Sequence, residues 1–226
     1  MAELHVVATP IGNLDDITVR ALSVLRGADF VLCEDTRHSG RLLSHFDIRK
    51  PLVPCHAHNE ERAVGDVLAR LKAGQTGALV TDAGTPGVSD PGGKVVAAVR
   101  EAGFPVIPVP GPSALAAVLS VAGVPGKAVL FEGFLSPKKG RRRKRLSELV
   151  ERGEIAVFYE SPFRIVQLLQ DLLDIDSTAT VLVGREMTKM HEEYLYGMVS
   201  EVLNQLSARA AIKGEITVLV SPTKKG

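Results

Sequence analysis

The stretch HVVATPIGNLDDITVRALSVLRG, residues 5–27, decides the fold class because a polar turn joins an apolar run to a helical pattern. Residues 5–9 are typical of a buried strand. The apolar residues after the turn recur at helical spacing: Ile17, Ala21, Leu22 and Leu25. Gly27 then ends the pattern, as a glycine after the last helical turn does. A strand followed by a helix is the unit from which α/β sheets are built.

The same rhythm continues through the first half of the chain. Strand-like runs occupy residues 30–33, 78–81 and 106–109. A second helix begins at Asn59, a residue type that favours helix N-termini, and ends at Gly74. Strands alternating with helices predict an α/β domain.

The composition changes after a short apolar helix over residues 112–123, where a turn at 124–126 follows. We place a domain boundary there, which gives one α/β domain over residues 1–123 and a second over residues 124–226. The second half repeats the rhythm, with strands at 128–131, 156–159, 180–183 and 215–220 and helices centred near Leu146, Leu168 and Leu203. The predicted fold class is therefore α/β with two α/β domains.

The composition limits the classes of protein to which the chain belongs. With 226 residues, 45% of them hydrophobic, it can bury a core, which excludes disordered and fibrous classes. Aromatic residues make up only 4% and Trp is absent, so the core must be largely aliphatic. The N-terminus lacks the features of a signal peptide and the apolar runs are too short to cross a bilayer. We therefore expect a cytoplasmic protein without a membrane partner.

The two cysteines stand apart. Cys33 and Cys55 have no CxxC spacing, so we expect both to be reduced packing residues. Cys55 lies beside His56 and near His58, but no second ligand pair follows at zinc-finger spacing, and zinc needs three or four ligands. The sequence therefore predicts no metal site.

Polar loops follow three of the predicted strands, at residues 8–16, 82–93 and 110–114. Open α/β sheets bind ligands at the carboxyl ends of their strands, so we expect these loops to converge on one rim. In the long second loop, glycines allow close approach of the backbone to a ligand, and Asp82 and Asp90 offer acceptors. A purely structural turn is the alternative. Neither a dinucleotide fingerprint nor a phosphate-binding loop is present.

Other polar clusters also follow strands. Glu34 and Asp35 come after the second strand, where they either cap a helix or line the same rim. Residues 159–164 repeat this arrangement in the second half of the chain. Residues 184–193 form a dense polar loop, for which a solvated charge run is the alternative. Gly214 introduces the last strand and allows close approach of a ligand.

Basic residues are concentrated in one run, although the formal net charge is only +1. No acidic partner for pairing within a helix occurs before Glu148, so the run predicts contacts with nucleic-acid phosphates. An ordinary solvated helix face is the alternative. The predicted RNA-binding residues are Lys138, Lys139, Arg141, Arg142, Arg143, Lys144 and Arg145.

These motifs in this order resemble the tetrapyrrole methylase superfamily, and within it the ribosomal RNA small subunit methyltransferase I family. The resemblance runs over nearly the whole chain. It rests on TPIGNLDDI, CEDTR followed by LLSHF, DAGTPGVSDPG, PGPSA, FEGFL with the basic run, YESPFRI, REMTK and KGE. Phe163 departs from the family pattern, in which a histidine is expected.

The resemblance implies S-adenosyl-L-methionine as the cofactor, held between two domains, and the ribose 2'-oxygen of a cytidine in 16S rRNA as the methyl acceptor. It also implies a homodimer with 16S rRNA or the small ribosomal subunit as partner. The implied cofactor-binding residues are Pro10, Ile11, Gly12, Asp82, Gly84, Thr85, Val88, Asp90, Ser113, Ala114, Tyr159, Glu160, Lys213, Gly214, Glu215 and Thr217. The catalytic candidates, three proton acceptors and one phosphate-steering lysine, are Asp35, Glu34, Glu186 and Lys189.

Two other functions stay open. A tetrapyrrole methyltransferase of the corrin or siroheme type would use the same donor with another acceptor. A non-catalytic RNA-binding protein would use only the basic helix and would not bind S-adenosylmethionine.

Overall fold

The computed structural model describes residues 2–124 and 128–223, and the chain divides into two compact units, Met1–Ser113 and Ala114–Gly226. The division falls after Ser113 rather than after residue 123, because helix α5 (Ala114–Ala122) packs against strands β10 (Ile216–Ser221) and β8 (Thr180–Arg185). Beyond Val124, the turn predicted at 124–126 lies outside the described residues. Each unit is an α/β domain, which confirms the predicted fold class.

Unit 1 is built on a parallel five-stranded sheet in the order β3-β2-β4-β1-β5. Its strands are β1 (Leu4–Val7), β2 (Phe30–Cys33), β3 (Leu52–Pro54), β4 (Gly77–Leu79) and β5 (Val106–Val109). Both faces of the sheet are covered, and all four residues of β2 are buried. Strands buried on both faces have continuous apolar runs rather than alternating ones, as the sequence shows at β2.

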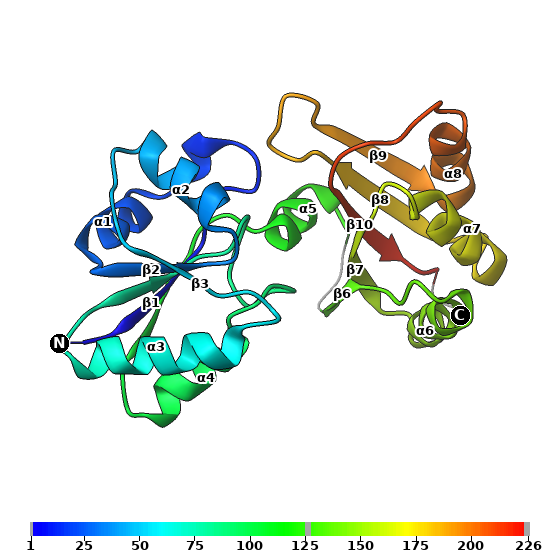
Figure 1. Cartoon of the computed structure of the whole chain (residues 1–226). Helices are drawn as coiled ribbons and strands as arrows, with labels where there is room; N and C mark the ends of the chain where they lie inside the picture. The colour runs from blue at the N-terminus through cyan, green and yellow to red at the C-terminus, as the bar shows by residue number, and fades with distance from the viewer. Residues whose placement is uncertain (1, 125–127, 224–226) are drawn as a thin grey trace. The chain divides into compact units, whose positions relative to one another are not determined.

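The helices of unit 1 form two layers. The 3-10 helix η1 (Leu14–Asp16), α1 (Val19–Gly27) and α2 (Thr36–His45) follow β1 and β2, and Leu25 of α1 and Leu43 of α2 belong to one core. On the other face, α3 (Glu60–Lys72) and α4 (Gly93–Glu101) lie side by side (Figure 1) and pack into a second core. The sheet therefore separates two aliphatic cores.

Unit 2 has a mixed five-stranded sheet in the order β6-β7-β10-β8-β9. Besides β8 and β10, it contains β6 (Val129–Phe134), β7 (Ile155–Glu160) and β9 (Glu193–Met198). Only β6 and β7 pair in parallel, and the other pairs are antiparallel. A β-bulge interrupts the pairing of β6 with β7 between Phe131 and Gly133.

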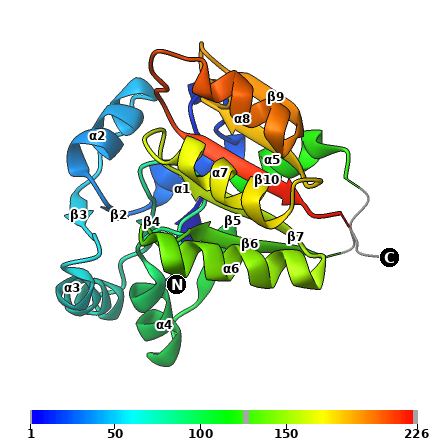
Figure 2. The ribbon, with the colours of Figure 1, turned by 90° about the vertical axis from the view of Figure 1, so that its right-hand side faces the viewer.

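Three helices cover one face of the second sheet: α6 (Lys139–Arg152), α7 (Ile165–Ile175) and α8 (Val199–Ser207). In Figure 2 they lie in front of the strands, and they share one aliphatic core with residues such as Phe158 and Val218. Helix α5 packs on β10 and β8 from the opposite side, behind the strands in Figure 2. No helix in the described part of the chain is both long enough and apolar enough to span a bilayer.

Candidate functional site

The loops after β1, β4 and β5 are joined at the carboxyl ends of the strands of unit 1. The backbone N–H of Thr9 donates to the carbonyl of Gly84 at 2.8 Å, and the N–H of Gly84 donates back at 3.0 Å. The hydroxyl of Thr85 donates to the carbonyl of Pro112 at 3.1 Å. The three loops predicted to converge therefore lie together on one rim.

Two glycines fix how closely these loops pack. Gly84 has φ +81°, and a Cβ there would lie 3.4 Å from Cγ2 of Ile11. A Cβ on Gly111 would lie 3.1 Å from Cβ of Ala8. Gly87 also has a left-handed φ of +80°, but it faces open space. The rim thus has a backbone shape that L residues adopt only with strain.

Three carboxylates, Glu34, Asp82 and Asp90, lie close enough together on this rim to influence one another electrostatically. We call them the rim carboxylates. Burial raises the pKa of Asp90 to about 6, with a further contribution from Glu34 that a hydrogen bond with Thr81 opposes. Burial and the charge of Asp82 also raise the pKa of Glu34. A carboxyl group with a pKa of about 6, as in Asp90, holds and releases a proton near neutral pH.

Asp35 has a different environment. It is the N-cap of α2, where its Oδ1 accepts the backbone N–H of Arg37 at 2.7 Å, and its Oδ2 lies 2.9 Å from the guanidinium of the same residue. These interactions lower the pKa of Asp35 to about 2. Its backbone N–H also donates to Oδ1 of Asp82 at 3.2 Å. Asp35 therefore acts as a helix cap that links α2 to the rim.

In unit 2, the catalytic candidates Glu186 and Lys189 are bound to the turn before β10. Oε1 of Glu186 accepts the backbone N–H of Glu215 at 2.8 Å and lies 3.0 Å from Nζ of Lys189. The same Nζ lies 3.0 Å from Oε2 of Glu215. Glu186 itself has φ +50°, and its side chain occupies the space that a Cβ on Gly214 would need. The two loops are therefore interlocked.

The contacts between these two loops make both Glu186 and Lys189 less suited to proton transfer. The backbone hydrogen bond from Glu215 and the hydrogen bond from Lys189 lower the pKa of Glu186. Burial acts to lower the pKa of Lys189, but hydrogen bonds to Glu215 and Glu186 outweigh it, so the pKa is raised. Both groups are charged and already paired, which suits a structural clamp better than proton transfer.

The second-unit residues predicted to bind the cofactor lie on different sides of the sheet. Thr217 of β10 pairs with Tyr159 of β7, so both point to the face that α5 packs against. Glu160, the next residue along β7, points to the helix-covered face. There it is buried, 2.7 Å from the guanidinium of Arg164, and accepts the N–H of Ser161.

The prediction that the basic run is unpaired is wrong for three of its seven members. Arg142, 4% exposed, lies 2.6 Å from Asp171, which is 0% exposed. Arg143 bridges Asp171 and Asp174. Arg145 pairs with Glu132 and Glu148. Most of these acids lie on β6 and α7, so a search for partners within one helix could not find them.

The other four basic residues are exposed and form no salt bridge with a described residue. We call this set, Lys138, Lys139, Arg141 and Lys144, the free cations. The charge of Lys139 lowers the pKa of Asp174 less than Arg143 does, and the charge of Lys144 lowers the pKa of Glu148 less than Arg145 does. The free cations are therefore available to a phosphate backbone, whereas Arg142 is not.

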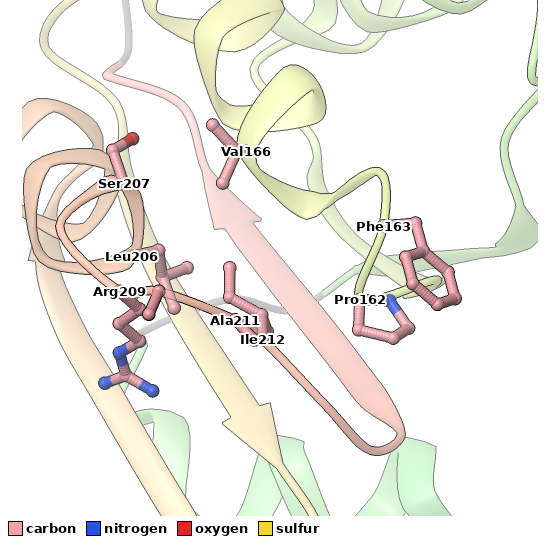
Figure 3. A pocket seen from close by; sticks show the side chains of 9 residues that line it. Pro162, Phe163, Val166, Leu206, Ser207, Arg209, Ala211 and Ile212 are labelled. Atoms are coloured by element: carbon pink, nitrogen blue, oxygen red, sulfur yellow. The ribbon is translucent and has the colours of Figure 1, made fainter.

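Unit 2 also contains a pocket of about 400 Å³, a volume within the range of small-ligand sites. In Figure 3, Pro162 and Phe163 lie on one side of it and Leu206, Arg209 and Ile212 on the other. Phe163, the residue that departs from the family pattern, is 92% exposed. This pocket could not be predicted from the sequence, because its two walls are at least forty positions apart in the chain.

Both cysteines are free thiols buried in unit 1, where burial raises their pKa values, that of Cys55 to about 11. Across residues 2–124 and 128–223, no group of three His, Cys, Asp or Glu side chains is arranged to hold a metal ion.

Comparisons with known proteins identify relatives of the whole chain. The model of the tetrapyrrole (corrin/porphyrin) methylases matches residues 3–212. The chain is 43% identical over 221 residues to a ribosomal RNA small subunit methyltransferase I of Thermotoga maritima, with 98% of this chain and 99% of the relative covered.

Solved structures share the fold at low sequence identity. The methyltransferase CobJ matches with a TM-score of 0.72 and 18% identity, covering 100% of this chain and 98% of the other. A uroporphyrin-III C-methyltransferase from Thermus thermophilus, in complex with S-adenosylhomocysteine, matches with a TM-score of 0.67 and 19% identity over 96% of this chain and 97% of the other.

Proposed function

Because this chain belongs to the tetrapyrrole methylase family, and within it to the ribosomal RNA small subunit methyltransferase I group, we propose that it methylates the ribose 2'-oxygen of a cytidine in 16S rRNA. Membership makes it an S-adenosylmethionine-dependent methyltransferase of small-subunit ribosomal RNA. What we propose beyond family membership is that the methyl acceptor is a ribose 2'-oxygen and that the nucleotide is a cytidine.

The rim of unit 1 is the single observation that best supports the proposal. It combines a backbone shaped by left-handed glycines, of which Gly87 faces open space, with the rim carboxylates. The donor is a sulfonium cation with ribose hydroxyls, so a site that offers close backbone approach and carboxylate acceptors suits it. We assign its binding to the loops around Ile11, Thr85 and Ser113. The predicted contacts of unit 2 stay predictions.

When bound, S-adenosylmethionine supplies a methyl group on a sulfonium centre that needs no further activation. The residues of the chain must therefore position the ribose oxygen in line with that methyl group, and alignment contributes on the order of 7–11 kcal/mol for well oriented reactants. The carboxylates must also accept the hydroxyl proton. Positioning is the larger contribution.

The proton acceptor is best assigned to the neighbouring carboxylates Glu34 and Asp90. Both have raised pKa values, and that of Asp90 is about 6, close to the pH at which a general base works well. Asp35 and Glu186 have lowered pKa values and engaged oxygens, which makes them weaker bases. Glu34 is thus the sequence-predicted base that the structure favours, with Asp90 beside it.

The RNA would bind through the free cations of unit 2, because neutralising phosphates releases counterions and gives salt-dependent affinity. We also propose that the protein acts in the cytoplasm as a homodimer, which light scattering on the purified protein would test. A second copy would double the number of free cations offered to one ribosomal subunit.

The decisive experiment is methyl transfer from radiolabelled S-adenosylmethionine to small subunits that lack the modification, followed by mapping of the labelled nucleotide. Label on a cytidine 2'-oxygen is expected. Label on a base, or on another nucleotide, would contradict the assigned acceptor. Donor binding without transfer to RNA would favour a tetrapyrrole acceptor, and absence of donor binding would favour an RNA-binding protein without catalysis.

A further inference from the structure

The β-bulge in β6 has a consequence for the aromatic residues around it. Phe131 and Phe134 are three positions apart, so in a regular strand they would point to opposite faces. The bulge inserts one extra residue, and Gly133 has the left-handed φ of +61° that such bulges use. Phe131 then pairs with Val157 and Phe134 with Tyr159, two positions apart on β7. Both phenylalanines therefore lie on the same face.

Three rings consequently meet at the β6 edge of the sheet. The ring centroid of Tyr159 lies 5.0 Å from that of Phe131 and 5.8 Å from that of Phe134, both in edge-to-face arrangements. We call Phe131, Phe134 and Tyr159 the aromatic platform. Phe134 is 57% exposed, although it is supported by Tyr159. A supported ring with an open surface is suited to stacking.

The positively charged residues that follow β6 indicate what the aromatic platform would bind. β6 ends at Phe134 and α6 begins at Lys139, so the first free cation, Lys138, is within about 14 Å along the chain. Glu132 in the bulge is neutralised by Arg145. Phe134 is an exposed ring at the β6 edge, and exposed positive charge follows it within five residues of the chain. The ring lies on the α5 side of the sheet and α6 covers the other side, so a strand of RNA would pass around this edge. Rings and cations together bind single-stranded nucleic acid, in which phosphates meet the cations and a base meets the ring.

We propose that the aromatic platform stacks an unpaired base of the RNA substrate on Phe134, while the free cations hold the adjacent phosphates. This inference rests on the proposed function and adds a base-stacking site to it. It also predicts that the protein prefers an unpaired segment of RNA to a duplex, since a paired base cannot reach the ring.

The test compares Phe134→Ala, Phe134→Trp and Tyr196→Ala in binding to a short labelled oligoribonucleotide, single-stranded and annealed. Tyr196 is 62% exposed on β9, the opposite edge of the same sheet and about 19 Å away, and is the matched control. Phe134→Ala should weaken single-strand binding roughly 5- to 150-fold without changing the salt slope. Phe134→Trp should restore it, and Tyr196→Ala should match the wild type.

Several outcomes would overturn the inference. Unchanged single-strand affinity in Phe134→Ala would remove the platform from RNA binding, even if the wild type methylates small subunits. An equal loss for the annealed duplex would exclude stacking. Weaker binding of S-adenosylmethionine would assign the ring to the donor, and a loss seen only with whole subunits would assign it to a protein partner. Failure of the wild type to bind any RNA would instead refute the proposed function.

Discussion

Unit 1 and unit 2 are both α/β domains, but they differ in their sheets and in the kinds of functional side chain that they carry. Unit 1 has an all-parallel sheet buried on both faces, and its polar groups gather at the carboxyl ends of the strands. Unit 2 has a mixed sheet and holds seven of the ten aromatic residues, together with the basic run. The comparison suggests that unit 1 is shaped for a small cationic donor and unit 2 for a large anionic acceptor.

Within unit 2, neighbouring arginines with different roles provide the sharpest test of this division. Arg142→Ala should destabilise the protein by about 3 kcal/mol or more, because it leaves the buried carboxylate of Asp171 without its main partner. Arg141→Ala should change the free energy of unfolding little, since Arg141 is exposed and forms no salt bridge with a described residue. Chemical denaturation of both variants measures the difference. Equal stabilities would contradict the assignment.

In unit 1, a bulky residue at Gly84 should weaken donor binding. Gly84→Val forces a β-branched residue into φ +81° against Ile11, so we expect at least a tenfold loss of affinity for S-adenosylmethionine, about 1.4 kcal/mol or more. Gly103→Val is the matched control, since Gly103 has the same φ of +81° but nothing near its Cβ. Calorimetric titration measures both. A similar loss in the control would mean that strain alone is responsible.

Removing the free cations should weaken RNA binding and leave donor binding intact. With all four replaced by Ala, the slope of log affinity against log salt should fall by about 3, if each contacts one phosphate of a single strand. Anisotropy titrations across a salt series would measure the slope. An unchanged slope would refute the assignment of these cations to RNA binding. A loss of donor affinity would contradict the assignment of donor binding to unit 1 alone.

The smallest expected effect concerns Asp90. Its pKa is raised in the folded protein, so folding favours its protonated form, and this contribution to stability is present below pH 4 and lost as the pH rises to about 6. Asp90→Asn should therefore stabilise the protein at pH 7, by on the order of 1 kcal/mol because the group is partly solvated. Thermal unfolding between pH 4 and 8 would show it. The same variant should lower turnover, and unchanged turnover would remove Asp90 from proton transfer.

The sequence predicted the architecture well where one pattern dominates. The strands at residues 30–33 and 106–109 and the helix after Asn59 appear where they were expected. β3 was missed because it is only three residues long, and β9 because it is an edge strand that begins within a polar loop. Short and edge strands have weak local signals, since their pairing partners define them.

The sequence motifs predicted which residues belong to the candidate site, but not which of those residues interact with one another. The sequence grouped Glu34 with Asp35, whereas the structure separates a carboxylate of raised pKa from a helix cap of lowered pKa. The pairing of Arg142 with Asp171 and the bulge at Gly133 depend on residues brought together only by folding. The roles assigned to these residues stay predictions that the experiments above can test.

The contact between Glu186 and Gly214 also constrains how this chain can evolve. Any side chain at position 214 would displace the Glu186 carboxylate from the N–H of Glu215, so a substitution there is harmful while Glu186 remains. A smaller residue at position 186 would remove the clash but lose the clamp. The two positions are therefore epistatic. In a double-mutant cycle, the change in the free energy of unfolding of the double variant should differ from the sum of the changes of the two single variants. In related sequences we expect them to change together or not at all.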